Sequence, residues 1–172
     1  GQFKKAINLL IRVTEINPSH LDVYYNLGNA FKQLKDFQKA KEYYEKEIEI
    51  QPKNAKAYNN LGNVLKELGN LQKAINSYRQ TIQIQPNHAR AYHNLGNVLK
   101  QLGDFKKAKN SYQKAFQYQP SNLETLDALS GLDKEILDPN LKNKINEILK
   151  NKNLTKKNVA YGNFLLSKYE FQ

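Results

Sequence analysis

A period of 34 residues is the feature that most constrains what this chain can fold into. Residues 55–88 and 89–122 align without a gap, and 20 of the 34 aligned positions are identical. The preceding segment, residues 21–54, follows the same pattern of tyrosine, Leu-Gly, alanine and proline. A period of this length indicates short supersecondary units that stack on their neighbours, and it argues against a single wound domain.

Each period predicts two helices joined by a turn. Within residues 55–88, Gly69-Asn70 signals the turn and Pro86 ends the second helix. Neither helix can bury its apolar stripe alone, so we predict a hairpin that packs on the next hairpin. The two stripes consist of Tyr58, Leu61, Leu65 and Leu68, and then Leu71, Ala74, Ile75, Tyr78 and Ile82.

Position 8 of each period, counted from residues 21, 55 and 89, is a glycine inside the first predicted helix. A glycine there costs about 1 kcal/mol relative to alanine, so we expect a second helix to cross at this point. The small residues expected on the facing helix are Ala40, Ala74 and Ala108. A bulky residue at Gly62 should therefore disrupt the hairpin by steric clash.

This pattern resembles the tetratricopeptide signature, in which an aromatic residue, Leu-Gly, alanine and proline recur in register. Tyr24, Tyr58 and Tyr92 stand where that signature has tryptophan. The resemblance covers about residues 1–130 and implies an all-α, right-handed solenoid of helix-turn-helix repeats. We predict a solenoid over 1–122, made of a half repeat at 1–20 and full repeats at 21–54, 55–88 and 89–122.

Residues 123–172 depart from the period, and we predict a degenerate repeat followed by C-terminal capping helices. Ser121 with Glu124 has the spacing of a capping box, and Asp138-Pro139 and Thr155 are further predicted helix starts. The tail from Asn158 is similar to the segment that follows the repeats in bacterial tetratricopeptide–sulfotransferase fusions.

Charge and composition narrow the partners. The net charge is +11, and residues 55–122 hold 10 Lys and Arg against 2 acidic residues. This excess favours an acidic peptide, a phosphate-bearing ligand or a nucleic acid; the alternative is a solvated surface rich in lysine and asparagine. No apolar run reaches 18 residues, so we expect no membrane span and a cytoplasmic protein. The chain begins within a repeat and lacks methionine, so we expect a fragment that could self-associate end to end through its half repeat.

The resemblance implies that the first helix of each repeat lines a concave surface. On that surface, positions 6 and 9 are asparagine and position 12 is lysine in every full repeat. A side-chain amide both donates and accepts, so an asparagine row can bond to the backbone of an extended peptide, while lysines attract acidic residues. The predicted peptide-binding residues are Asn26, Asn29, Lys32, Asn60, Asn63, Lys66, Arg90, His93, Asn94, Asn97 and Lys100.

Two further resemblances bear on this surface. The row Asn26, Asn60 and Asn94 resembles the repeat domain of O-linked N-acetylglucosamine transferases, where such residues hold the substrate polypeptide. The alternative is a solvated groove copied by repeat duplication. The carboxylate clamp of chaperone-binding tetratricopeptide domains is incomplete, because Tyr25 stands at its first lysine position and Asn94 at its arginine position.

No motif points to catalysis. The chain has no cysteine, its three histidines (His20, His88 and His93) form no H-x-x-x-H ligand pair, and no phosphate-binding loop is present. We therefore predict a non-enzymatic scaffold without cofactor or metal that binds a peptide or partner protein. The alternative is the substrate-docking arm of a larger glycosyl- or sulfotransferase. RNA binding ranks last, because Tyr25 is the only inward aromatic residue expected to stack on bases.

Overall fold

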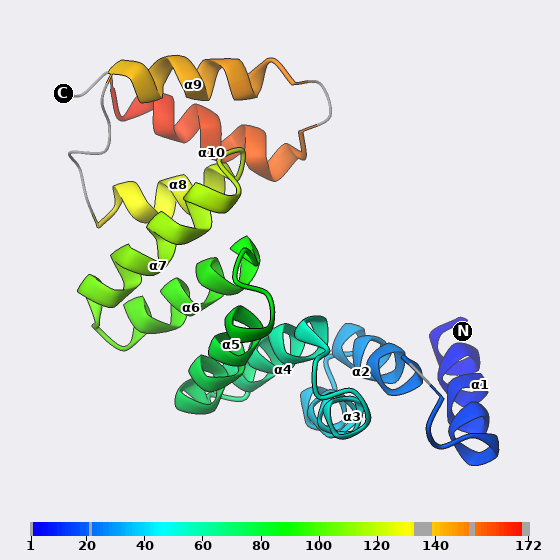
Figure 1. Cartoon of the computed structure of the whole chain (residues 1–172). Helices are drawn as coiled ribbons and strands as arrows, with labels where there is room; N and C mark the ends of the chain where they lie inside the picture. The colour runs from blue at the N-terminus through cyan, green and yellow to red at the C-terminus, as the bar shows by residue number, and fades with distance from the viewer. Residues whose placement is uncertain (1, 21, 133–138, 152–153, 170–172) are drawn as a thin grey trace. The chain divides into compact units, whose positions relative to one another are not determined.

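The computed structural model describes residues 2–20, 22–132, 139–151 and 154–169, and their regular elements are all α-helices (Figure 1). The predicted all-α repeat fold is confirmed. The helices are α1 (Gln2–Ile16), α2 (Val23–Gln33), α3 (Phe37–Ile50), α4 (Ala55–Glu67), α5 (Leu71–Ile84), α6 (Ala89–Gln101), α7 (Phe105–Tyr118), α8 (Leu123–Ser130), α9 (Pro139–Leu149) and α10 (Lys156–Ser167).

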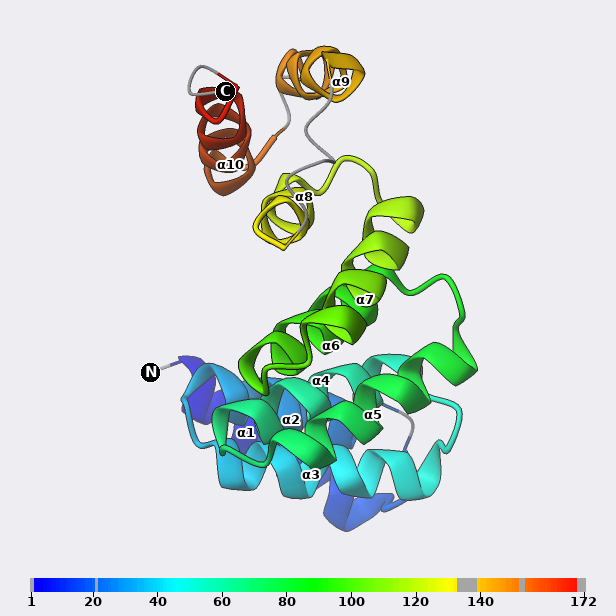
Figure 2. The ribbon, with the colours of Figure 1, turned by 90° about the vertical axis from the view of Figure 1, so that its left-hand side faces the viewer.

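The chain divides into two compact units, Gly1–Asn87 and His88–Gln172, which we call unit 1 and unit 2. In unit 1 the hairpins α2/α3 and α4/α5 stack through α3 and α4, and α1 packs on α2 (Figure 2). The helices thus form successive layers, as the 34-residue period predicts. The centres of the predicted apolar stripes are buried, as at Leu61, Leu65 and Tyr78, whereas their ends at Tyr58, Leu68, Leu71 and Ile82 are only partly buried.

Unit 2 contains the α6/α7 hairpin and the helices that follow it. Helix α7 packs on α8, and α10 packs on both α8 and α9. The core of these last helices is aliphatic, with half-buried aromatic rings around it. Its buried members are Leu123, Leu126, Leu141, Ile145 and Leu165. This cluster gives the C-terminal helices a core of their own even though their sequence has left the period.

In two of the three full repeats, the residue just before the repeat caps the repeat's first helix. Asn54 accepts a hydrogen bond from the backbone N–H of Ala57 (3.1 Å), and Nδ1 of His88 accepts one from Ala91 (3.1 Å). Such caps satisfy backbone donors that the helix itself cannot. Helix α2 begins later in its repeat, at Val23, and its cap residue Asp22 has a φ of 62° and makes no side-chain cap.

The same position starts the first C-terminal helix. The predicted capping box at Ser121 is wrong, because Asn122 caps α8 through the N–H of Thr125 (3.2 Å). The predicted cap at Thr155 is confirmed by its bond from the N–H of Asn158 (3.2 Å). Asp138 lies outside the described residues.

The position-8 glycines lie where the two helices of a hairpin touch, as predicted. A Cβ atom added to Gly62 would stand 2.5 Å from Cε1 of Tyr78, and the corresponding distances at Gly28 and Gly96 are 2.6 Å and 2.7 Å. The space is therefore filled by the tyrosine at position 24 of the same repeat. The sequence had suggested the facing alanines instead; they are fully buried.

Candidate peptide-binding surface

The asparagines at position 9 have an internal role that the sequence did not reveal. In each full repeat the hydroxyl of the buried position-24 tyrosine donates to the Oδ1 of this asparagine. The pairs are Tyr44 with Asn29 (2.7 Å), Tyr78 with Asn63 (2.9 Å) and Tyr112 with Asn97 (2.7 Å). A buried hydroxyl without a partner would cost about 1–3 kcal/mol, so this row completes the hairpin core.

The tyrosine hydroxyls stay protonated in this environment. Burial raises the pKa of Tyr112 to about 12. It also raises the pKa of Tyr44 and Tyr78, with smaller contributions from the neighbouring Tyr25 and Glu67 respectively. A protonated hydroxyl is the donor that the asparagine oxygen requires.

In unit 1 the position-6 asparagine of the second full repeat extends this network. Nδ2 of Asn60 donates to Oδ1 of Asn29 (3.0 Å) and to the hydroxyl oxygen of Tyr25 (3.2 Å). Asn29 therefore accepts from both Asn60 and Tyr44, and the bonds join α2, α3 and α4. Tyr25 is thereby tied through its hydroxyl to Asn60, and its ring packs against the ring of Tyr44 at a centroid distance of 6.0 Å.

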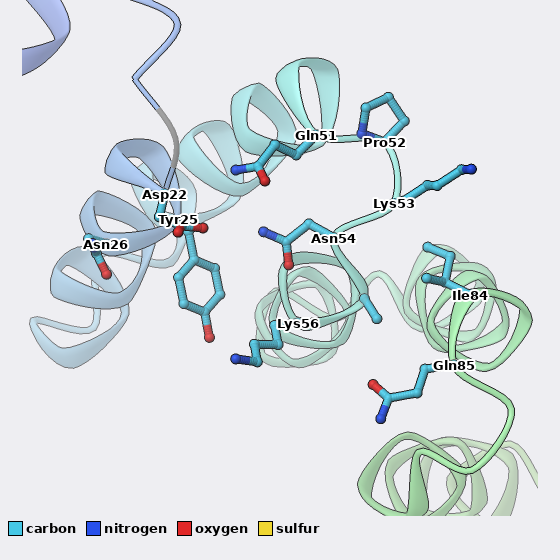
Figure 3. A pocket seen from close by; sticks show the side chains of 11 residues that line it. Asp22, Tyr25, Asn26, Gln51, Pro52, Lys53, Asn54, Lys56, Ile84 and Gln85 are labelled. Atoms are coloured by element: carbon cyan, nitrogen blue, oxygen red, sulfur yellow. The ribbon is translucent and has the colours of Figure 1, made fainter.

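Beside Tyr25, unit 1 has a hollow of about 1010 Å³ (Figure 3). Figure 3 shows that its walls come from the start of α2, the turn between α3 and α4, the start of α4 and the end of α5. The lining residues are Asp22, Tyr25, Asn26, Gln51, Pro52, Lys53, Asn54, Ala55, Lys56, Ile84 and Gln85. The aromatic ring, the aliphatic residues and the amide groups give it both an apolar and a polar side.

Several polar groups of this hollow remain available to a ligand. Within the part of the chain that the structure describes, no hydrogen bond or ion pair engages the side chains of Asn26, Lys53, Lys56 or Gln85. The hydroxyl of Tyr25 accepts from Asn60 and can still donate its proton. The hollow therefore offers amide donors and acceptors together with two ammonium groups, opposed by the carboxylate of Asp22.

Of the predicted peptide-binding residues, Asn26 lines this hollow. The others of unit 1 lie along the inner helices, with Asn60 turned toward Tyr25 and Lys66 within 3.1 Å of Glu67. Asp22 and Lys56 were missed although both occupy position 2, which the tetratricopeptide resemblance places on the inner face. The turn residues were missed because the period gives no sign that an inter-repeat turn closes a hollow.

In unit 2, Arg90 and Lys100 are exposed and Asn94 is half-buried. His93 is buried between α6 and α8. Its Nδ1 lies 2.9 Å from Oγ1 of Thr125 and its Nε2 lies 3.0 Å from Nδ2 of Asn97. The imidazole also packs against the ring of Tyr112. In this structure His93 links helices, as the position-9 asparagines do.

Two further properties of the described residues bear on other classes of site. Residues 2–20, 22–132, 139–151 and 154–169 contain no group of three or more His, Cys, Asp or Glu side chains placed to hold a metal ion. None of the helices described in the same ranges is long and apolar enough to cross a membrane.

The period, the stacked hairpins and the tyrosine beneath each position-8 glycine define a class, the helical-hairpin repeat proteins. Family models of the tetratricopeptide repeat match residues 1–35, 21–54 and 53–121. The chain belongs to the tetratricopeptide repeat family, and the resemblance noted in the sequence is confirmed at this level.

Solved structures show the same fold. A crystal structure of MamA is 20% identical in sequence and has a TM-score of 0.75. The match covers 99% of this chain and 92% of the MamA chain. A second MamA crystal structure is 23% identical with a TM-score of 0.73, and the match covers 99% of this chain and 84% of the MamA chain. The Arabidopsis OM64 TPR domain is 26% identical with a TM-score of 0.64, covering 66% and 93%. No curated protein sequence matches the chain. The resemblances to glycosyl- and sulfotransferases stay predictions.

Proposed function

We propose that this chain is a protein-interaction module that binds an extended segment of a partner protein in the hollow of unit 1. Tetratricopeptide domains generally mediate protein–protein interactions. The observation that carries the proposal is the hollow itself, in which the Tyr25 hydroxyl is bonded to Asn60 while Asn26, Lys53, Lys56 and Gln85 lack partners within the described chain.

The chemistry of the hollow indicates what the segment would present. Amide side chains at Asn26 and Gln85 can bond to a peptide backbone without selecting its side chains. The ammonium groups of Lys53 and Lys56 favour an acidic residue, because an opposite charge at a partly desolvated site is attractive. The ring of Tyr25 supplies apolar contact, and its bond to Asn60 and its packing on Tyr44 reduce the entropy that it would lose on binding.

The test is a selection from a displayed library of random peptides of about ten residues, long enough to span about 33 Å when extended. Wild-type protein serves as bait, and fluorescence anisotropy then measures the selected peptides. We expect enrichment of Asp and Glu. Tyr25→Ala and Lys56→Ala should each weaken binding about tenfold, as loss of an interface anchor does.

Lys73→Ala is the matched control, because Lys73 is an exposed lysine of α5 that does not line the hollow. It should leave the affinity unchanged. A selection that yields no binding peptide, or peptides that bind Tyr25→Ala and Lys56→Ala as tightly as wild type, would refute the proposal. Circular dichroism of each variant shows that the helices remain.

A further inference from the structure

A buried carboxylate lies behind the hollow. The side chain of Glu47, in α3, is only 1% exposed. Its Oε2 accepts from the backbone N–H of Tyr25 (3.1 Å), and its Oε1 accepts from the side-chain amides of Gln51 (2.5 Å) and Asn54 (2.8 Å). Burying a charge is costly unless hydrogen bonds replace its water. All three donors belong to residues that line the hollow.

These bonds connect the first turns of two successive inner helices. Tyr25 is the third residue of α2, whose own cap position at Asp22 makes no side-chain bond. Glu47 therefore caps α2 from the neighbouring helix. Asn54 uses its Oδ1 to cap α4 at Ala57 while its Nδ2 donates to Glu47. One carboxylate thus sets the spacing of the α2 and α4 starts, and the hollow opens between them.

The corresponding positions of the other repeats carry no such group. Position 27 is Thr81 in the next repeat and Ala115 in the one after it. Thr81 donates to the carbonyl oxygens of Ser77 (3.0 Å) and Ala55 (3.4 Å), so it bonds to acceptors where Glu47 bonds to donors. The carboxylate arrangement is therefore peculiar to the repeat at 21–54.

We propose that Glu47 is the positioning residue that makes this one inter-repeat junction a peptide site. Glu47 touches no ligand. It acts by fixing the Tyr25 backbone and the Asn54 side chain, so that the ligand-facing groups of α2 and α4 keep the spacing that a peptide needs. This inference rests on the proposed function, and it assigns the specificity of the site to a residue behind its wall.

The hydrogen-bond chemistry predicts that glutamine cannot replace Glu47. A carboxamide has one acceptor oxygen and an NH2 group, whereas the site presents three donors. The Gln51 amide can turn to offer its own oxygen. The Asn54 amide cannot do so without losing the α4 cap. Either the backbone N–H of Tyr25 or the side-chain NH2 of Asn54 then faces the NH2 group of the new glutamine. Two donors cannot bond to each other, so the junction must rearrange.

The experiment compares Glu47→Gln and Glu47→Thr with Glu49→Gln. Thr is the residue of the matching position 81, and Glu49 is an exposed glutamate of the same helix, so the last variant makes the same charge change at the surface. Proton–nitrogen NMR spectra first report the amide shift and exchange rate of Tyr25 without any peptide. The peptides selected on wild-type protein, as described above, then give the affinities.

We expect both Glu47 variants to move the Tyr25 amide resonance upfield, to speed its exchange, and to weaken peptide binding about tenfold. Glu49→Gln should change neither. In the Tyr25→Ala background, Glu47→Gln should add a smaller loss than in wild type, because the ring that Glu47 helps to place is already gone and only its effect on the start of α4 remains. A purely structural role would instead add its full effect.

The outcomes separate the two proposals. An unchanged Tyr25 amide in Glu47→Thr overturns the positioning role, whatever the peptides do. Perturbed amides with undiminished peptide affinity overturn the link to binding. If wild-type protein selects no peptide while the Glu47 variants still perturb Tyr25, the proposed function has failed, the specificity role fails with it, and only the structural positioning of Tyr25 by Glu47 stands.

Discussion

The repeat hairpins and the C-terminal helices bring helices into close contact in different ways. In the hairpins, Gly28, Gly62 and Gly96 each face a tyrosine ring. The hydroxyl of that tyrosine donates to the asparagine that directly follows the glycine in the sequence. In the C-terminal helices, Gly162 of α10 faces the methyl groups of Leu149 and Leu123, at 2.6 Å and 2.9 Å from an added Cβ. The first contact is rigid and polar at its tip, and the second is aliphatic.

Polar contacts hold the C-terminal helices from outside their core. Asn158 of α10 accepts from the N–H of Leu123 (3.0 Å) and donates to the carbonyl of Ser121 (2.9 Å). Lys168 bonds to Asp127 (2.6 Å) and to Ser130 (2.9 Å). In the hairpins the polar bond sits inside the unit that repeats, so the whole arrangement could be copied with the period. The C-terminal contacts join segments far apart in sequence and could not be copied in that way.

The largest expected effect tests the rigid contact. Gly62→Ala should lower the free energy of unfolding by about 3 kcal/mol, although alanine gains about 1 kcal/mol in helix propensity. The added Cβ would meet the middle of a fully buried ring that has no room to move. Urea denaturation followed by circular dichroism measures the change.

Gly69→Ala is the control for that variant. Gly69 has a φ of +76° and open space around it, so alanine there should cost about 1 kcal/mol through backbone strain alone. A Gly62→Ala cost no greater than that of Gly69→Ala would contradict the steric explanation of the position-8 glycine.

The next effect tests the polar tip of the tyrosine. Asn63→Ala leaves the buried hydroxyl of Tyr78 without its acceptor and should cost about 2 kcal/mol. Tyr78→Phe removes the hydroxyl itself, so that no buried donor is left unsatisfied, and should cost about 1 kcal/mol. The double variant should be no less stable than Asn63→Ala alone. Stability measured across this cycle checks the coupling, and strictly additive costs would show that the bond contributes nothing.

A smaller effect is expected in the aliphatic contact. Gly162→Ala should cost about 1 kcal/mol, because the atom nearest to the added Cβ is a methyl group of Leu149, a flexible and only partly buried side chain. The comparison with Gly62→Ala in the same denaturation assay sharpens the distinction between the two regions. Equal costs would mean that the tyrosine ring is no stiffer a neighbour than leucine.

The smallest effect concerns the helix caps. Desolvation, with a further contribution from the charge of Arg90, lowers the pKa of His88 below its usual 6.5, so the folded protein favours the neutral imidazole that caps α6. This stability is present above about pH 6.5 and is lost as pH falls through the folded pKa. His88→Asn, which copies the cap of α4, should make the stability less sensitive to acid, because asparagine does not titrate.

Urea denaturation of wild type and His88→Asn at about pH 7 and about pH 5 measures this difference. The remaining histidines are common to both proteins and cancel in the comparison. A wild-type stability that falls no more steeply with acid than that of the variant would exclude His88 as the source.

The fold could be predicted because the period repeats one local helix-turn-helix pattern several times. The turn at Gly69, the stop at Pro86 and the close approach at Gly62 all follow from backbone physics that is visible in the sequence. The sequence did not show which side chain each residue contacts in the folded protein. The space beside Gly62 was assigned to alanine because both residues are small, but the tyrosine ring fills it.

The candidate site was harder to predict for a related reason. Asn63 looks like a ligand-binding amide, and only the spatial position of Tyr78 shows that it serves the core. Glu47 gave no signal at all, since its three bonds converge from a helix start, a helix end and a turn. Periodicity describes what the repeats have in common, whereas the carboxylate beside the hollow is found at this position only in the repeat at 21–54 among the full repeats.

The caps at Asn54 and His88 bear on how such an array can change length. Each is the last residue of its own period, yet it starts the first helix of the next. Excising residues 55–88 would place Asn54 directly before Ala89, and α6 would still begin on a side-chain acceptor. Loss of this period therefore keeps a capping side chain at the new junction. Duplication of residues 55–88 would likewise place His88 directly before Ala55, so the added helix would also begin on a side-chain acceptor.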